Sequence, residues 1–375
     1  MNRVLSLDGG GMRGVFTLEI LARIEALLRQ RYNKPELVLS DYFNFIGGTS
    51  TGAIVAGLLS WGRSVDEIKE YYQRFAGSAF QRWWKIYRTW YDAAPIRQNL
   101  RGLFLENNGQ PALLGTERLR TFFLVVLRNA STGSTWPLTN NPDAIYNRRD
   151  RLHSNLDLPL WQLNRASTAA PTYFPCEVVT LVASDGQERV FEFIDGGVSP
   201  HNNPSLLMYL FATLPQYRMN FAAGVDNLYI LSVGTGSESI VAAPGEMIRI
   251  DQVRGALRAF KGLMSAVNEQ QDVMCRAIGR CIYGPPIDRE VGDLIPQAID
   301  PAAAARFLYC RYNYSFTQDD YRRARLDYGS RSPLALDDLR SIPLLRELGT
   351  SYAADNVKVE HLPDAPLLTG RLAKF

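Results

Sequence analysis

The chain has 375 residues, of which 46% are hydrophobic and 21% are charged. This composition is ordinary for a globular protein with a real core, and the length allows one large α/β domain or two smaller ones. The formal net charge of +3, from 41 basic and 38 acidic residues, gives no electrostatic reason to expect a nucleic-acid partner. No apolar run approaches the roughly 20 residues of a membrane-spanning helix. Met1 leads directly into a strand-like segment with no signal peptide, so we expect a cytoplasmic protein.

Strand-like and helix-like segments alternate through the first half of the chain. Short apolar runs have the length of buried strands, and longer segments with apolar residues three or four positions apart have the spacing of helices. Such alternation is typical of a mostly parallel sheet covered by helices on both faces. The expected strands are 4–7, 43–46, 122–127 and 228–233, and the first expected helices are 15–32 and 53–59.

The pattern changes in two later regions. Residues 132–155 are polar and rich in Asn, Asp, Arg and Pro, which predicts a long excursion or loop. After about Gly245 helical spacing dominates, and 248–280 is the longest expected helix. We therefore divide the chain into 1–240 and a mostly helical extension, 241–375, packed on the same domain. A dimerisation surface and a regulatory module are both open as roles for this extension.

A glycine-rich loop, Asp8–Gly14, follows the first strand and opens the first helix. Its glycines let backbone N–H groups approach a ligand closely, and the helix N-terminus adds a partial positive charge, so the loop can hold a phosphate or an oxyanion. The loop also satisfies G-x-G-x-x-G, the dinucleotide-binding pattern. That pattern expects an acidic residue at the end of the next strand, about 20 residues on, where this chain is still helical. A nucleotide-binding oxidoreductase is therefore the weaker alternative.

A serine between two glycines, Gly48-x-Ser50-x-Gly52, follows the second strand and opens an apolar helix. On a sharp strand-to-helix turn such a serine projects its hydroxyl, as nucleophilic serines do. The alternative is an ordinary helix N-cap, for which serine is also favoured. The glycine loop favours the nucleophile, because acyl transfer needs both a nucleophile and donors for the oxyanion.

A serine nucleophile needs a base, and the chain has three histidines, His153, His201 and His361. Only His201 lies near another motif, because His153 is in a charged loop and His361 is in a polar tail. Asp195, which ends a strand-like run and precedes two glycines, is the better candidate. An Asp-Gly-Gly turn is the plain alternative, but a carboxylate within reach of the hydroxyl can accept its proton directly.

Four blocks of this sequence resemble the signature of the patatin-like phospholipases, in order and in spacing. The resemblance covers about residues 3–208 and extends to a strand that ends at Gly236. The four blocks are Asp8–Gly14, Gly48–Gly52, Ala166–Pro175 and Asp195–Gly197. The resemblance implies a three-layer α/β fold, with a mostly parallel central sheet covered by helices, and a catalytic domain over 1–240.

The resemblance also implies a phospholipase A type reaction, in which acyl ester bonds of phospholipids are cleaved by a serine–aspartate dyad. Metal ions and cofactors are not needed for this chemistry. The implied roles are nucleophile for Ser50, base for Asp195, and oxyanion hole for the amides of Gly9, Gly10 and Gly11. A catalytically weak storage or lipid-binding protein on the same fold is the alternative.

Two further residues come from the same blocks. By motif position Arg13 braces the glycine loop or contacts a lipid phosphate. The loop after Asp195 departs from the family, because Ser199-Pro200-His201 is one residue longer than the usual spacing before Asn202-Asn203-Pro204. The extra residue brings His201 close to the dyad, so a proton path through His201 stays open.

Aromatic and basic residues alternate over Trp83–Tyr91. Trp and Tyr suit the boundary between lipid and water, and Arg and Lys attract anionic head groups, so this segment predicts a peripheral membrane contact. An aromatic cap over the core explains the composition equally well. A homodimer is a further expectation, as is activation by a small nucleotide signal, because some bacterial relatives that this chain resembles are switched on by cyclic nucleotides.

Overall fold

The computed structural model describes residues 1–79, 89, 91–148, 154–182, 186–238, 252–288, 290–295, 305–328, 335 and 337–368. Within these residues a nine-stranded sheet forms the centre of the molecule, in the order β5-β6-β3-β2-β1-β7-β10-β9, and β4 pairs with β3. Its strands are β1 (Asn2–Leu7), β2 (Phe45–Thr49), β3 (Phe122–Asn129), β4 (Ser134–Thr139), β5 (Glu177–Val182), β6 (Glu188–Asp195), β7 (Leu228–Val233), β9 (Arg280–Tyr283) and β10 (Leu308–Tyr312). A separate pair joins β8 (Ser237–Glu238) to β11 (Ser315–Phe316).

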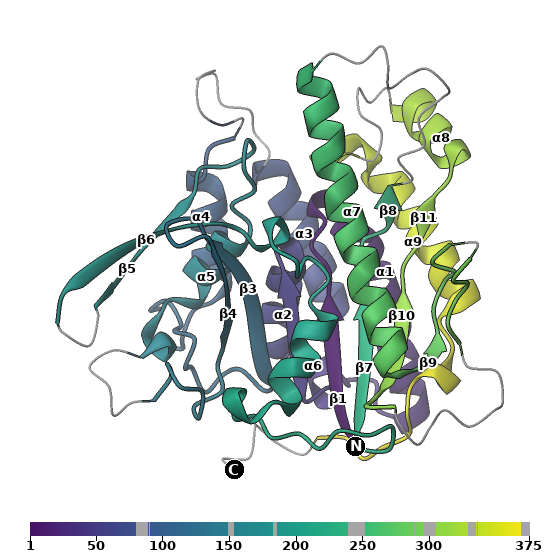
Figure 1. The fold of residues 1–375 in the computed structure, drawn as a ribbon, viewed down its shortest axis with the longest axis horizontal. Helices are drawn as coiled ribbons and strands as arrows, with labels where there is room; N and C mark the ends of the chain where they lie inside the picture. Colours follow the sequence, from purple (N-terminus) through teal and green to yellow (C-terminus); the bar gives the residue numbers. More distant parts are fainter. Residues whose placement is uncertain are drawn as a thin grey trace.

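Helices cover both faces of this sheet, as the alternation of segments predicts (Figure 1). The helices are α1 (Gly14–Tyr32), α2 (Thr51–Ser60), α3 (Val65–Ala79), α4 (Ala94–Leu103), α5 (Leu160–Ser167), α6 (Ser205–Thr213), α7 (Gln252–Ile278), α8 (Gln318–Tyr328) and α9 (Ile342–Asn356). The expected three-layer α/β architecture is confirmed.

Side-chain alternation along β1 shows how the two faces are filled. Leu5 and Leu7 pack into a core shared with α1, α2 and α9, whereas Val4 packs into a second core shared with α6 and the end of α7. Consecutive side chains of a strand point to opposite faces, so one apolar run serves both layers. Figure 1 shows α6 and α7 in front of the sheet, with α1 and α2 behind it.

The strands from β3 through β2, β1, β7 and β10 to β9 are all parallel, and β4, β5 and β6 add antiparallel pairs at the other side. Parallel strands end at one edge, so β1 and β2 deliver the glycine loop and the serine turn to the same place. Both segments therefore leave the sheet side by side.

Two expectations need correction. Residues 132–155 are not only a loop, because β4 lies within them and pairs antiparallel with β3. The C-terminal region supplies the expected long helix as α7, but it also supplies β9 and β10, which extend the central sheet beside β7. Each of these strands contains an arginine, so neither forms the uninterrupted apolar run from which the other strands are expected.

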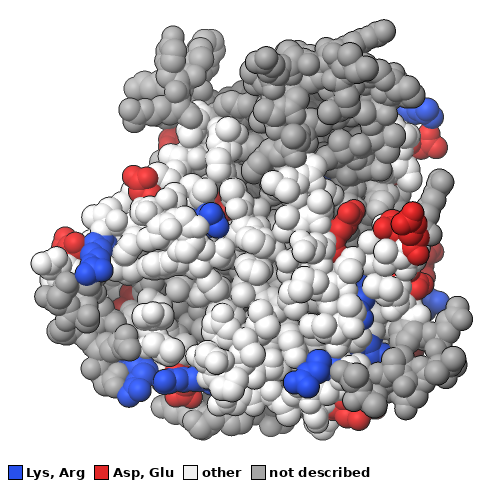
Figure 2. All heavy atoms as spheres, in the orientation of Figure 1, with Lys and Arg blue, Asp and Glu red and all other residues white. Residues whose placement is uncertain are grey.

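Among the described residues, charged side chains are sparse on the face that carries α6 and α7. Figure 2 shows them scattered, mostly toward the margin, around a largely uncharged centre. Among the described residues no helix is both long and apolar enough to cross a bilayer.

Candidate active site

Ser50 occupies the sharp turn between β2 and α2, with φ of 54° and ψ of −128°. Residues other than glycine rarely adopt such a backbone, and here the neighbouring glycines make it sterically possible. A Cβ on Gly48 would lie 2.3 Å from the carbonyl oxygen of Gly52, and a Cβ on Gly52 would lie 2.5 Å from that of Asp8. The turn is therefore a strained elbow that holds the serine out at the N-terminus of α2.

Asp195 reaches Ser50 because β2 and β6 share one edge of β3. Thr49, the last residue of β2, pairs with Val126, and Asp195, the last residue of β6, pairs with Leu127. The two strands run in opposite directions along this edge, so their ends meet. The Ser50 hydroxyl donates a 2.6 Å hydrogen bond to Oδ2 of Asp195, and both residues are buried.

The second carboxylate oxygen of Asp195 accepts a 2.7 Å hydrogen bond from the Gly197 amide. Burial raises the pKa of Asp195 to about 6, while the hydrogen bonds from Ser50 and Gly197 and the positive charge of Arg165 oppose that rise. At neutral pH the carboxylate is therefore ionised, and its basicity is closer to the working pH than that of an ordinary aspartate. Such a pKa suits a general base.

The segment around Ser167, at the end of α5, holds both Ser50 and Asp195. The Ser50 amide donates to Oγ of Ser167 at 2.8 Å, and that hydroxyl donates to the Val126 carbonyl at 2.7 Å. The Asp195 amide donates to the carbonyl of Ala169 at 3.0 Å. The sequence patterns do not predict this role of Ser167. The sign that could have indicated it is a hydroxyl among the small residues of its block.

The glycine loop lies against the serine turn and is held by two other segments. The Gly9 carbonyl accepts hydrogen bonds from the Asn202 side chain at 3.3 Å and from the Thr235 hydroxyl at 3.2 Å. The Gly9 amide donates to the carbonyl of Asn202 at 3.1 Å. A Cβ at Gly9 would lie 2.4 Å from Oδ1 of Asn202, so the close approach requires glycine here.

The three amides expected to form an oxyanion hole differ in the hydrogen bonds that they already make. The Gly9 amide is engaged by Asn202, and the Gly10 amide makes a long 3.3 Å contact with Oγ1 of Thr51. The Gly11 amide makes no hydrogen bond to any residue that the structure describes. Gly11 also has φ of 56°, a conformation for which glycine is favoured.

Comparison with known protein families gives a match over the part of the chain that carries these residues. The family model of the patatin-like phospholipases matches residues 5–208, which include the glycine loop, Ser50 and Asp195. The chain belongs to the patatin-like phospholipase family. Membership points to lipid acyl ester hydrolysis at the level of the family.

Curated relatives agree with the family over a similar stretch. Patatin-17 of Solanum cardiophyllum is 31% identical over 252 residues, which are 64% of this chain and 61% of that protein. The cGAMP-activated phospholipase of Escherichia coli (strain TW11681) is 30% identical over 255 residues, 64% of each protein. The cGAMP-activated phospholipase of Vibrio cholerae is 30% identical over 262 residues, 65% of this chain and 67% of that protein. The match thus spans less than two thirds of the first two relatives.

Arg311 is a member of the site that lies outside the stretch matched by the patatin-like phospholipase model. Its guanidinium donates to both carboxylate oxygens of Asp8, at 2.9 and 2.6 Å, and to the Ser232 hydroxyl at 2.6 Å. Burial raises the pKa of Asp8, and Arg311 opposes that rise. The sequence patterns did not single out this arginine; a lone charge inside the apolar strand β10 was the signal that could have found it.

The two histidines that the structure describes, His201 and His361, make contacts other than with the side chains of Ser50 and Asp195. His201 contacts the serine turn through its main-chain carbonyl, which accepts a 2.6 Å hydrogen bond from the Thr49 hydroxyl, and burial lowers the pKa of its imidazole. His361 hydrogen-bonds the Tyr312 hydroxyl through Nδ1 at 2.8 Å and stacks on Tyr283. His153 lies outside the described residues.

The Trp83–Tyr91 segment also falls mostly outside the described residues, which include only Thr89 and Tyr91 of it. Tyr91 is buried, packs against Tyr173 and Phe174, and donates to a carboxylate oxygen of Asp337 at 2.6 Å.

The described residues can also be compared with a dinucleotide-binding site and with a metal site. The strand β2 is followed by Ser50 and Thr51 instead of the acidic residue that a dinucleotide-binding site would place there. No group of three or more His, Cys, Asp or Glu side chains that could hold a metal ion occurs in the described portion of the chain.

Proposed function

We propose that the protein is a lipid acyl hydrolase of the phospholipase A type, which cleaves acyl ester bonds of phospholipids. The single observation that carries this proposal is the 2.6 Å hydrogen bond from the Ser50 hydroxyl to Asp195, made by a serine on a strained elbow. A serine that served only as a helix N-cap would need neither a backbone with positive φ nor a buried carboxylate as the acceptor of its hydroxyl.

In the proposed reaction Asp195 accepts the Ser50 proton as Oγ attacks the ester carbonyl carbon. The tetrahedral intermediate collapses with loss of the lysolipid alkoxide, which takes the proton from Asp195. Water then attacks the acyl-serine with Asp195 again as the base, and the fatty acid leaves as Ser50 recovers its proton.

The oxyanion of both tetrahedral intermediates is assigned to the glycine loop. Of the expected donors Gly9, Gly10 and Gly11, the amides of Gly10 and Gly11 are better suited, because the Gly9 amide already donates to Asn202. Amide donors together with the N-terminus of α2 supply the stabilisation, so neither a metal nor a cofactor belongs to the proposal. Arg13 is proposed to brace this loop or to contact the lipid phosphate.

Partners and organisation follow from the same proposal. The substrate is a phospholipid or a related acyl-ester lipid, approached by a cytoplasmic protein that binds the membrane surface peripherally through Trp83–Tyr91. Two relatives are named as cGAMP-activated phospholipases, which supports activation of this chain by a small nucleotide. We also propose a homodimer. We further propose that the chain divides into a catalytic domain over residues 1–240 and an extension over residues 241–375 packed on it. The Asp8–Arg311 pair supports that packing.

The test is product analysis on a mixed lipid extract, with the full chain, in the presence of a chelator. We expect release of fatty acid and lysophospholipid at a rate that the chelator does not change. Ser50→Ala is the matched control, since it removes one oxygen. A storage or lipid-binding protein would bind vesicles without releasing fatty acid, and its serine would not react with a fluorophosphonate probe.

A further inference from the structure

Tyr72 of α3 contacts the glycine loop from outside the four sequence blocks. Its side chain is buried, and its hydroxyl donates a hydrogen bond to the carbonyl oxygen of Gly11. A Cβ on Gly14 would lie 2.5 Å from the same hydroxyl oxygen, so the first residue of α1 must be small for the tyrosine to fit. The hydroxyl is thus enclosed by both ends of the turn that runs from Gly11 into α1.

The same hydroxyl holds the residue that carries one of the candidate oxyanion donors. It donates to the carbonyl of Gly11, whose own amide makes no hydrogen bond to any described residue. Gly11 has a positive φ, and glycine in such a turn can rotate easily unless its peptide groups are tied down. The Gly10 carbonyl, which lies in the same peptide plane as the Gly11 amide, accepts a 3.1 Å hydrogen bond from the Arg13 amide. With the Gly11 carbonyl held by Tyr72, the peptide groups on both sides of Gly11 are tied down, and this restricts the direction of its amide.

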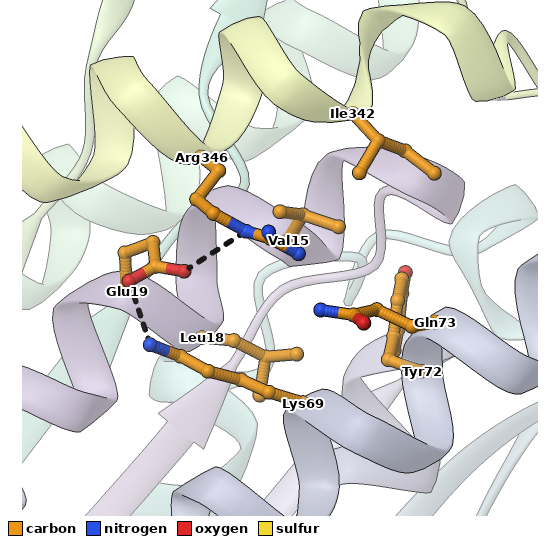
Figure 3. Close-up of a pocket in the computed structure, with 8 residues that line it drawn as sticks. All are labelled: Val15, Leu18, Glu19, Lys69, Tyr72, Gln73, Ile342 and Arg346. Carbon is orange, nitrogen blue, oxygen red and sulfur yellow. Dashed lines mark hydrogen bonds and ion pairs between the residues drawn. The ribbon is translucent and has the colours of Figure 1, made fainter.

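The position of Tyr72 is itself fixed by its helix. Figure 3 shows the pocket where Tyr72, Gln73 and Lys69 of α3 face α1 and α9. Lys69, one turn before Tyr72, forms a 2.6 Å ion pair with Glu19 of α1. Because α1 begins where the glycine loop ends, this pair sets α3 against the same helix that carries the loop.

We propose that Tyr72 is a positioning residue for the oxyanion-binding amide of Gly11, an inference that rests on the proposed function. Burial raises the pKa of its phenol above the ordinary value, so the hydroxyl remains a neutral donor throughout the working pH range. The tyrosine does not touch the reacting atoms. It acts by limiting the motion of a loop whose donors must point at the developing negative charge, and small misplacements of such groups slow the chemical step.

The test compares Tyr72→Phe with Tyr42→Phe on a short soluble ester. Tyr42 is also buried and donates its hydroxyl to a main-chain carbonyl, that of Pro363, at 2.6 Å, but it does not contact the glycine loop. Both variants lose one hydroxyl, so we expect similar small shifts in the thermal midpoint. For Tyr72→Phe we expect kcat to fall about tenfold with KM within about twofold of wild type, because the loss is confined to the transition state.

The rate of labelling by a fluorophosphonate should fall about as much as kcat for Tyr72→Phe, since the phosphonyl oxygen occupies the same hole. Tyr42→Phe should keep kcat and labelling within about twofold of wild type. Equal kcat in the two variants, or a change confined to KM, would overturn the positioning role. Failure of the proposed function looks different: the wild type would then hydrolyse and label no faster than Ser50→Ala.

Discussion

Asp8 and Arg311 are 303 positions apart in the chain and form a buried, two-point ion pair between the end of β1 and β10. Asp8 precedes the glycines that approach Ser50, and Arg311 belongs to the C-terminal strands that extend the sheet. One interaction thus ties the C-terminal extension to the loop that is assigned the oxyanion.

Arg311→Met should destabilise the fold strongly, by about 3–5 kcal/mol, because it leaves the Asp8 carboxylate buried without its partner. The free energy of unfolding in urea measures this. Arg322→Met is the matched control, since Arg322 pairs with Asp319 on the surface and both side chains are mostly exposed. Similar stability of the two variants would contradict a structural role for the buried pair.

Ser50→Ala should lower the rate of fatty acid release at least about 1,000-fold, because the variant has no nucleophile. Asp195→Asn should lower it about 100-fold or more, since an amide cannot accept the serine proton. Release of fatty acid from vesicles gives the rates, and circular dichroism checks the fold. The dyad assignment fails if Asp195→Asn turns over normally while His201→Ala is inactive.

The raised pKa of Asp195 determines how kcat/KM should depend on pH. Because the base must be ionised, kcat/KM should fall about tenfold per pH unit below pH 6, where Asp195 takes up a proton. Asp195→Asn removes this step from the residual activity. A profile that is flat between pH 7 and pH 5 would contradict the assignment of Asp195 as the base.

Asp195 also affects the free energy of unfolding, in the opposite direction from a salt-bridged aspartate. Its pKa is raised from 3.8 in the unfolded chain to about 6 in the fold, so the folded protein prefers the protonated carboxyl. Asp195 therefore costs no stability at low pH, and the ionised carboxylate destabilises the fold progressively as pH rises from about 4 through 6. Asp195→Asn should therefore unfold at a higher temperature than wild type at pH 8, by a margin that shrinks toward pH 4. Thermal unfolding at the two pH values measures it. Equal midpoints at pH 8 would show that the buried carboxylate carries no such cost.

Trp83 and Trp84 are predicted to govern access to membrane substrate and to take no role in the chemistry. Replacing both with Ser, or reversing the charge of Lys85 and Arg88 to Glu, should slow hydrolysis of anionic vesicles, since each basic residue near such a surface contributes about 1 kcal/mol. A short soluble ester should be hydrolysed at the normal rate. Salt should imitate the charge reversal on vesicles by screening. Equal losses on both substrates would mean that these aromatics belong to the core.

The serine turn could be read from the sequence because its geometry depends on neighbours in the chain. Gly48 and Gly52 permit the strained backbone of Ser50, so small residues at fixed spacing carry the information. The parallel sheet was also predictable, since β1, β2, β3 and β7 are apolar runs of strand length.

Other features of the site depend on contacts between distant segments. Asp195 becomes a partner of Ser50 only because β2 and β6 share an edge of β3, and Arg311 meets Asp8 only because β10 joins the sheet beside β7. Tyr72 reaches Gly11 only through the packing of α3 against α1. Periodicity and spacing describe what a segment can form by itself, whereas strand order and helix packing are decided by the burial of the whole core.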